Sequence, residues 1–305
     1  MHDSAIPLSA GSIPQRRWVL PMALLAVYVL WGSTYLGIRY ALTGFPPFTL
    51  AAIRFAVAGL AMYGWLRLSG VRPPTPRQWR NAATTGVLLL LCGNGLVCFA
   101  EQSVASGIAA VAVASEPLFV ALFLFAYRET PTRTELLGLV IGFVGVVVLN
   151  LGGELRAAPM AALALIVAAA AWAFGSIWSR RQDMPDGAMN VAAQMTCAAP
   201  ALALVAWIAG ERVPAHPSAA SIAALAYLVV FGSIIGFTAY LYLLRHVRPA
   251  LSASYAYVNP PVAVLIGALI AGERIGPLEL AGMAVILAGV GTIALARTWV
   301  PRRSR

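Results

Sequence analysis

One pattern occurs twice in the chain and restricts its fold more than any other feature. The segment SEPLFVALFLFAYRETPTRTELLGLVIGFVGVVVL at residues 115–149 returns in outline as NPPVAVLIGALIAGERIGPLELAGMAVILAGVGTIAL at residues 259–295. At one constant offset the matching pairs are Pro117 and Pro261, Glu129 and Glu273, Glu135 and Glu279, Gly138 and Gly282, and Gly145 and Gly289. Each copy has an apolar stretch, a short charged turn and a second apolar stretch rich in glycine. The pattern predicts a helical hairpin that crosses a membrane twice, built in two copies.

The composition excludes an ordinary soluble domain. Of the 305 residues, 60% are hydrophobic and only 10% are charged, whereas soluble proteins carry roughly 25% charged residues. The net charge of +10 does not indicate nucleic-acid binding, because nearly all the arginines stand between apolar runs, where they set membrane topology. We therefore expect a lipid bilayer around the chain and no nucleic-acid partner. The cysteines Cys92, Cys98 and Cys197 lie inside apolar runs, which favours neither a disulfide framework nor a zinc site.

The apolar runs predict ten transmembrane helices in two sets of five. The first set covers residues 18–40, 47–68, 81–101, 106–127 and 134–151, and the second covers 157–179, 188–209, 219–243, 250–271 and 278–297. Shifted by one residue, the same offset aligns Gly32-Ser33 with Gly175-Ser176, so the duplication includes the first helix of each set. We expect an all-α membrane protein with a tail at 1–17, repeats at 18–151 and 157–297, and a basic tail at 298–305. The first run lacks a cleavage motif and is interpreted as a retained helix, not a signal peptide.

The arginines predict the orientation, because positive residues concentrate on the cytoplasmic side. With a cytoplasmic N-terminus, the inner side holds Arg16, Arg17, Arg67, Arg72, Arg77, Arg80, Arg128, Arg133, Arg180, Arg181, Arg245, Arg248, Arg297, Arg302, Arg303 and Arg305. The outer side keeps Arg39, Arg156, Arg212 and Arg274. Both termini are then cytoplasmic. Since five helices is an odd number, the two repeats have opposite topology, which is typical of secondary transporters with a site near the midplane.

Two charged residues are expected inside the membrane, where a charge costs roughly 2.5–3.5 kcal/mol at the helix centre. Glu116 lies about halfway along the fourth span beside Pro117, and Arg54 lies well inside the second span. One interpretation is a buried ion pair between Arg54 and Glu116 that only braces the helices. In the other, one or both face a cavity, where they bind the charged ends of a zwitterion or carry a proton. The second repeat has Pro260 in place of Glu116, so only the first repeat could supply this charge to substrate or proton binding.

Uncharged polar and aromatic residues form the other candidate site. Tyr255 and Asn259 share one helix face, just before Pro260-Pro261, which we expect to break the ninth helix. An aromatic wall beside an amide suits a small polar substrate, although ordinary helix packing gives the same pattern. The residues expected to line a central cavity are Trp31, Ser33, Asn94, Trp172, Ser176, Tyr255 and Asn259, with Arg54 and Glu116 beside it or bracing it.

No catalytic constellation is visible in the sequence. The histidines His2, His216 and His246 lie in tails or loops, and the chain contains no GxxxxGK[ST], HExxH or GxSxG motif. We therefore expect a protein that is not an enzyme and has no metal site and no cofactor.

In these residues the chain resembles the EamA-type branch of the drug/metabolite transporter superfamily. The similarity includes Pro117 with Arg128-Glu129 and its copy Pro261 with Gly272-Glu273. WGSTYLGIR (31–39), GNGLVCFAE (93–101), WAFGS (172–176) and SYAYVNPPVAVLIG (254–267) are most similar to the YedA subgroup, with YddG- and RhtA-type amino-acid exporters as near relatives. The resemblance implies ten helices, alternating access, and export of amino acids or related metabolites across the bacterial inner membrane.

The sequence therefore predicts a secondary transporter that exports small polar metabolites, mainly amino acids with broad specificity. Two alternatives stay open: efflux of apolar cationic drugs held by a carboxylate such as Glu116, and a membrane-embedded enzyme or assembly factor. The sequence does not decide between proton coupling and facilitated diffusion. It also leaves open the oligomeric state, for which a monomer is one option.

Overall fold

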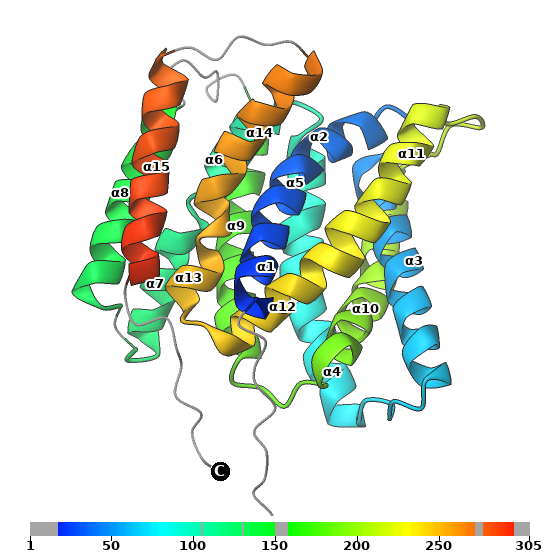
Figure 1. Cartoon of the computed structure of the whole chain (residues 1–305). Helices are drawn as coiled ribbons and strands as arrows, with labels where there is room; N and C mark the ends of the chain where they lie inside the picture. Colours follow the sequence, from blue (N-terminus) through cyan, green and yellow to red (C-terminus); the bar gives the residue numbers. More distant parts are fainter. Residues whose placement is uncertain (1–17, 105, 130, 150–157, 272–276, 296–305) are drawn as a thin grey trace, which may run out of the picture.

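The computed structural model describes residues 18–104, 106–129, 131–149, 158–271 and 277–295. The two predicted tails, 1–17 and 298–305, lie outside the described residues. Within the described part the regular elements are all helices, with no strands, and they form a single bundle (Figure 1). The expected all-α membrane fold with two five-helix repeats is confirmed.

Five helical spans build the first repeat. They are α1–η1–α2 (Val19–Ala26, Val27–Trp31, Gly32–Ala41), α3 (Pro47–Leu68), α4–η2–α5 (Pro76–Gly86, Val87–Gly95, Leu96–Ala100), the pair α6 and α7 (Ser106–Val113, Glu116–Ala126), and α8 (Arg133–Leu149). The segments η1 and η2 are π-helical turns inside otherwise α-helical spans. Pro47 and Pro76 lie in the first turn of their helices, where the missing N–H is not needed.

The second repeat has the same order of elements. Its spans are α9 (Pro159–Ser179), α10 (Gly187–Ile208), α11–η4–α12 (Ala219–Tyr227, Leu228–Ile235, Gly236–His246), the pair α13 and α14 (Pro249–Ala253, Tyr255–Ala271), and α15 (Pro277–Leu295). Six of the described spans are long and apolar enough to cross a membrane as one continuous helix. The fourth and ninth spans are each divided into two helices.

The positions of these breaks correct the sequence prediction for the ninth span. The helix does not break at Pro260-Pro261, which lie inside α14; it breaks at Ser254 instead. A membrane helix tolerates internal proline where neighbouring groups satisfy the carbonyls that it frees. At the break, the Ser254 hydroxyl donates to the carbonyl of Leu251 (2.8 Å) and bonds the Tyr28 hydroxyl (2.7 Å). The fourth span, expected to be one helix over 106–127, divides before Glu116.

Glycine contacts hold the last helices of the two repeats together. Helices α8 and α15 lie side by side and run in opposite directions (Figure 1). A Cβ on Gly138 would stand 2.8 Å from the Gly289 carbonyl oxygen, and one on Gly145 would stand 3.0 Å from that of Gly282. Only glycine permits this approach, so the glycine-rich stretches of the two repeats form a packing surface. On the other side of the bundle α3 packs against α10.

Candidate functional site

Residues of the first, second, third, fourth, sixth, eighth and ninth spans line a small central cavity of about 70 Å³. Of the seven residues predicted to line a central cavity, the structure brings Trp31, Asn94, Trp172, Tyr255 and Asn259 to this one. They come from the first, third, sixth and ninth spans and so from both repeats. Arg54 also contributes to the wall, whereas Glu116, Ser33 and Ser176 do not line the cavity.

The π-helical turns lie at the cavity. Segment η1 ends at Trp31, η2 contains Asn94, and η4 contains Gly232 and Ser233. A π-turn widens the helix by one residue and frequently marks a functional site. The carbonyl of Gly232 accepts a hydrogen bond of 3.0 Å from the indole N–H of Trp31. This bond joins the first span of one repeat to the third span of the other.

Five aromatic rings form a cluster, which we call the aromatic box: Trp31, Trp172, Phe237, Tyr240 and Tyr255. The Trp31 ring centroid is 5.4 Å from that of Trp172, 5.0 Å from Tyr240 and 4.8 Å from Tyr255. Edge-to-face contacts at such distances stabilise aromatic pairs beyond the area that they bury. The box closes the end of the cavity that is nearer to the arginine-rich side.

The hydroxyl of Tyr240 holds this box in place. It accepts a hydrogen bond of 3.1 Å from the Trp172 indole N–H and shares one of 2.5 Å with the Ser176 hydroxyl. Ser176 is thus behind the ring wall and binds Tyr240. Ser33 points elsewhere, because its hydroxyl contacts the Tyr227 hydroxyl and the Leu30 carbonyl. Tyr240 was not among the predicted site residues, although a tyrosine within an apolar run was a signal.

The ion pair that is one interpretation of Arg54 and Glu116 is not formed. Arg54 donates from Nε to the Ser233 hydroxyl (2.7 Å) and from Nη1 to Asn94 Oδ1 (3.2 Å). Both carboxylate oxygens of Glu116 are buried and have no hydrogen-bond partner among the described residues. Glu116 stands one turn before Val120, whose face packs against Ala173 and Ala253. The two charged side chains therefore project from their helices toward different neighbours.

A second, polar recess of about 500 Å³ opens at the arginine-rich end of the bundle. Gln78, Ser179, Arg180, Asn190 and Arg245 contribute to its wall. Along α9, Ser179 lies two helical turns beyond Trp172, which corresponds to about 10 Å at the α-helical rise. The layer between the recess and the cavity contains the Trp172–Ser176–Tyr240 hydrogen bonds.

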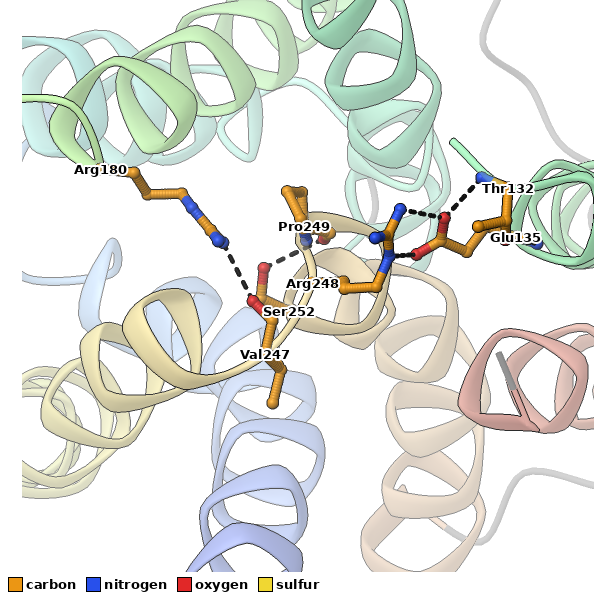
Figure 2. Close-up of polar contacts among 7 residues, drawn as sticks. All are labelled: Thr132, Glu135, Arg180, Val247, Arg248, Pro249 and Ser252. Carbon is orange, nitrogen blue, oxygen red and sulfur yellow. Dashed lines mark hydrogen bonds and ion pairs between the residues drawn. The ribbon is translucent and has the colours of Figure 1, made fainter. Parts of the chain in front are cut away.

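The loop between α12 and α13 is fastened at the same end. Figure 2 shows Arg180 donating to the carbonyl of Val247 (3.1 Å), while Arg248 contacts the carboxylate of Glu135. Glu135 also caps its own helix, because Oε2 accepts from the backbone N–H of Thr132 (2.7 Å). Glu135 accepts a hydrogen bond from Arg248 and so stabilises the charged form of the guanidinium. This raises the pKa of Arg248 above its ordinary value. All three ion pairs among the described residues lie at this end, joining Glu129 to Arg181, Asp186 to Arg245, and Glu135 to Arg248.

Comparison with known proteins identifies the family of this chain. The EamA-like transporter family matches the chain twice, over residues 17–151 and 159–295. The chain belongs to this family. As an EamA-like protein it is a membrane transporter, and the resemblance inferred from its motifs is confirmed.

Its relatives are also named as transporters. It is 42% identical over 290 residues to the "Uncharacterized inner membrane transporter YedA" of Escherichia coli, covering 94% of this chain and 95% of that protein. It is 26% identical to the "Probable terminal-alkyne amino-acid exporter" of Streptantibioticus cattleyicolor, covering 88% of this chain and 91% of that one. It is also 26% identical to the "Probable amino-acid metabolite efflux pump" of Salmonella typhimurium, covering 88% and 92%. A solved crystal structure with 21% identity superposes with a TM-score of 0.73 over 90% of this EamA-like chain and 96% of the other, which supports the fold.

Proposed function

We propose that this transporter exports small polar metabolites, mainly amino acids with broad specificity, through the central cavity. The observation that carries the proposal is the cavity itself, in which Arg54, Asn94 and Asn259 stand among aromatic rings. Such a mixture of apolar walls and a few oriented polar groups is typical of small-molecule sites. The amino-acid exporters among the relatives, at 26% identity, support the same substrate class.

Alternating access is the mechanism that we propose for this export. The cavity reaches Ile38, near the end of α2, and Val97 in α5, while four rings of the aromatic box line it on the side of Trp172. The recess would admit substrate from the cytoplasm once Trp172, Ser176 and Tyr240 separate. The repeats at 18–151 and 157–297 would rock against each other, as inverted repeats allow.

The proposed location is the bacterial inner membrane, with both termini in the cytoplasm. The relative that is 42% identical is named an inner membrane transporter, which supports this location. The start of α1 and the end of α15 lie at one end of the bundle (Figure 1), and this end carries most of the described loop arginines. We propose a monomer as the transporting unit, because the residues that line the described cavity come from one chain.

The arrangement of charges disfavours efflux of apolar cations. A cationic drug would need a carboxylate at the cavity, yet Glu116 does not line the described cavity and Arg54 does. A guanidinium in the wall repels a cation, whereas it attracts the carboxylate of an amino acid.

Release of amino acids from cells tests this proposal. Cells expressing the protein would be fed alanyl dipeptides, which they hydrolyse, and the alanine appearing in the medium would be timed against cells carrying an empty vector. We expect faster alanine release and unchanged accumulation of ethidium, an apolar cation. Unchanged alanine release together with lower ethidium accumulation would overturn the proposal in favour of cation efflux.

A further inference from the structure

Arg54 is a buried cation in the cavity wall that donates no described hydrogen bond to a carboxylate. The buried carboxylate of Glu101 interacts with it electrostatically but accepts no hydrogen bond. Arg54 is 3% exposed, and its two described hydrogen-bond acceptors, Ser233 and Asn94, are both neutral. None of the ion pairs in the described part of the chain includes it. A guanidinium in a membrane interior whose hydrogen-bond acceptors are all neutral is costly, and such residues commonly serve a substrate or ion pathway.

The protein holds this guanidinium in one position. Ser233 fixes Nε and Asn94 fixes Nη1, so the planar group has little freedom to rotate. A Cβ on Gly232 would stand 2.7 Å from Nη2, so only glycine at this position leaves room for the group. No hydrogen bond of Nη2 is described. A planar fork held rigidly is suited to bind a carboxylate, because little freedom is lost when the bonds form.

A hydrogen-bond acceptor in need of a donor shares the same cavity. Asn259 is 2% exposed, and its Oδ1 has no hydrogen-bond partner among the described residues. Leaving a buried acceptor without a donor costs about 1–3 kcal/mol. The rings of Trp31 and Tyr255, with centroids 4.8 Å apart, stand in the same wall and present electron-rich surfaces. An ammonium group satisfies both features, since it donates three hydrogen bonds and is attracted to aromatic faces.

We propose that Arg54 binds the carboxylate of the substrate and that Asn259 Oδ1, beside Trp31 and Tyr255, binds its ammonium group. The substrates are then zwitterions with a free carboxylate, and the protein rejects the corresponding amines and amides. This inference rests on the proposed function, because it assigns a recognition role to residues of the same cavity. Ser233 and Gly232 position the arginine and make no contact of their own with the carboxylate.

Ligand binding to the purified protein tests the inference independently of transport. The melting temperature in detergent would be measured with alanine, alaninamide, ethylamine and propionate at equal concentrations. We expect alanine to stabilise the wild-type protein at a concentration at least tenfold lower than alaninamide or ethylamine. Equal stabilisation by alanine and alaninamide, or none by any carboxylate, would overturn the inference.

Variants assign the effect to the arginine. In Arg54→Gln the preference for alanine over alaninamide should disappear, and Arg54→Lys, which keeps the charge without the fork, should restore part of it. Retention of the full preference by Arg54→Gln would overturn the inference.

A milder variant decides the case if Arg54→Gln fails to fold. Ser233→Ala removes the acceptor of the Arg54 Nε hydrogen bond and should weaken alanine binding by about three- to tenfold. The control is Ser221→Ala, because Ser221 is a buried serine on the same span and does not line the cavity. This control should not weaken alanine binding. Equal effects of the two serine variants would contradict the inference. Carboxylate-specific stabilisation without amino-acid release from cells would leave the inference standing and reject amino-acid export.

Discussion

Arg248 binds both carboxylate oxygens of Glu135 and so ties the second repeat to the first (Figure 2). The Nη2–Oε2 distance is 2.8 Å, and the Glu135 side chain is 3% exposed. At the constant offset between the repeats, Val104 occupies the position that corresponds to Arg248. The first repeat therefore has no arginine at the position of Arg248 in this ion pair, which we call the latch.

Glu135→Gln should destabilise the protein. Removing one partner of a partly buried, two-bonded pair costs about 1–3 kcal/mol, below the value for a fully buried pair because Arg248 is partly exposed. A thermal melt in detergent measures the loss. The matched control is Glu129→Gln, because Glu129 is 62% exposed in its pair with Arg181 and such pairs contribute about 0–1 kcal/mol. Equal losses in the two variants would contradict the structural importance of the latch.

Tyr240→Phe should loosen the layer between the cavity and the polar recess. The substitution removes the hydrogen bonds to Trp172 and Ser176 and keeps the ring, at a cost of about 1 kcal/mol each. We expect a lower melting temperature and a changed rate of substrate exchange. Tyr242→Phe is the control on the same helix, where the ring stacks on His246 with centroids 4.1 Å apart. The account fails here if the control alters exchange as strongly.

Gly289→Ala should disrupt the contact between α8 and α15. Its Cβ would stand 2.4 Å from the backbone nitrogen of Gly142, which can move only with its helix. Overpacking of this kind costs about 1–3 kcal/mol. Gly291→Ala is an almost ideal control because its Cβ would meet no atom within 4 Å. A melting temperature lowered by the first variant and unchanged by the second would support the packing; the reverse order would refute it.

Glu116→Gln should leave a folded and active protein. The carboxylate is buried without a partner, so replacing it removes a group that is costly as an anion. We expect an unchanged or raised melting temperature and at least half of the wild-type alanine exchange, with the same response to a pH gradient. Complete loss of exchange in a folded variant would instead assign Glu116 to the transport cycle.

Sequence periodicity and duplication were sufficient to predict the ten spans and their approximate bounds, but they did not predict that α8 packs on α15. Trp31, Asn94, Trp172, Tyr255 and Asn259 could also be grouped from the sequence, because each is a polar or aromatic residue inside a predicted span. Of the two interpretations of Arg54 and Glu116, the ion pair is not formed. Helix periodicity gives the face of each residue on its own helix but not the neighbour of that face. Ser233, which binds Arg54 from a span 179 residues away, carries no local signal of that contact.

Counterflow in proteoliposomes tests the central claim most directly. Purified wild-type protein would be reconstituted with a high internal concentration of unlabelled alanine, and uptake of labelled alanine would be followed beside Arg54→Gln, with alaninamide as the competing control. The account predicts saturable uptake that alanine suppresses and alaninamide does not, and loss of most uptake in the variant. Absence of uptake by folded wild-type protein would contradict the account, as would full uptake by the variant.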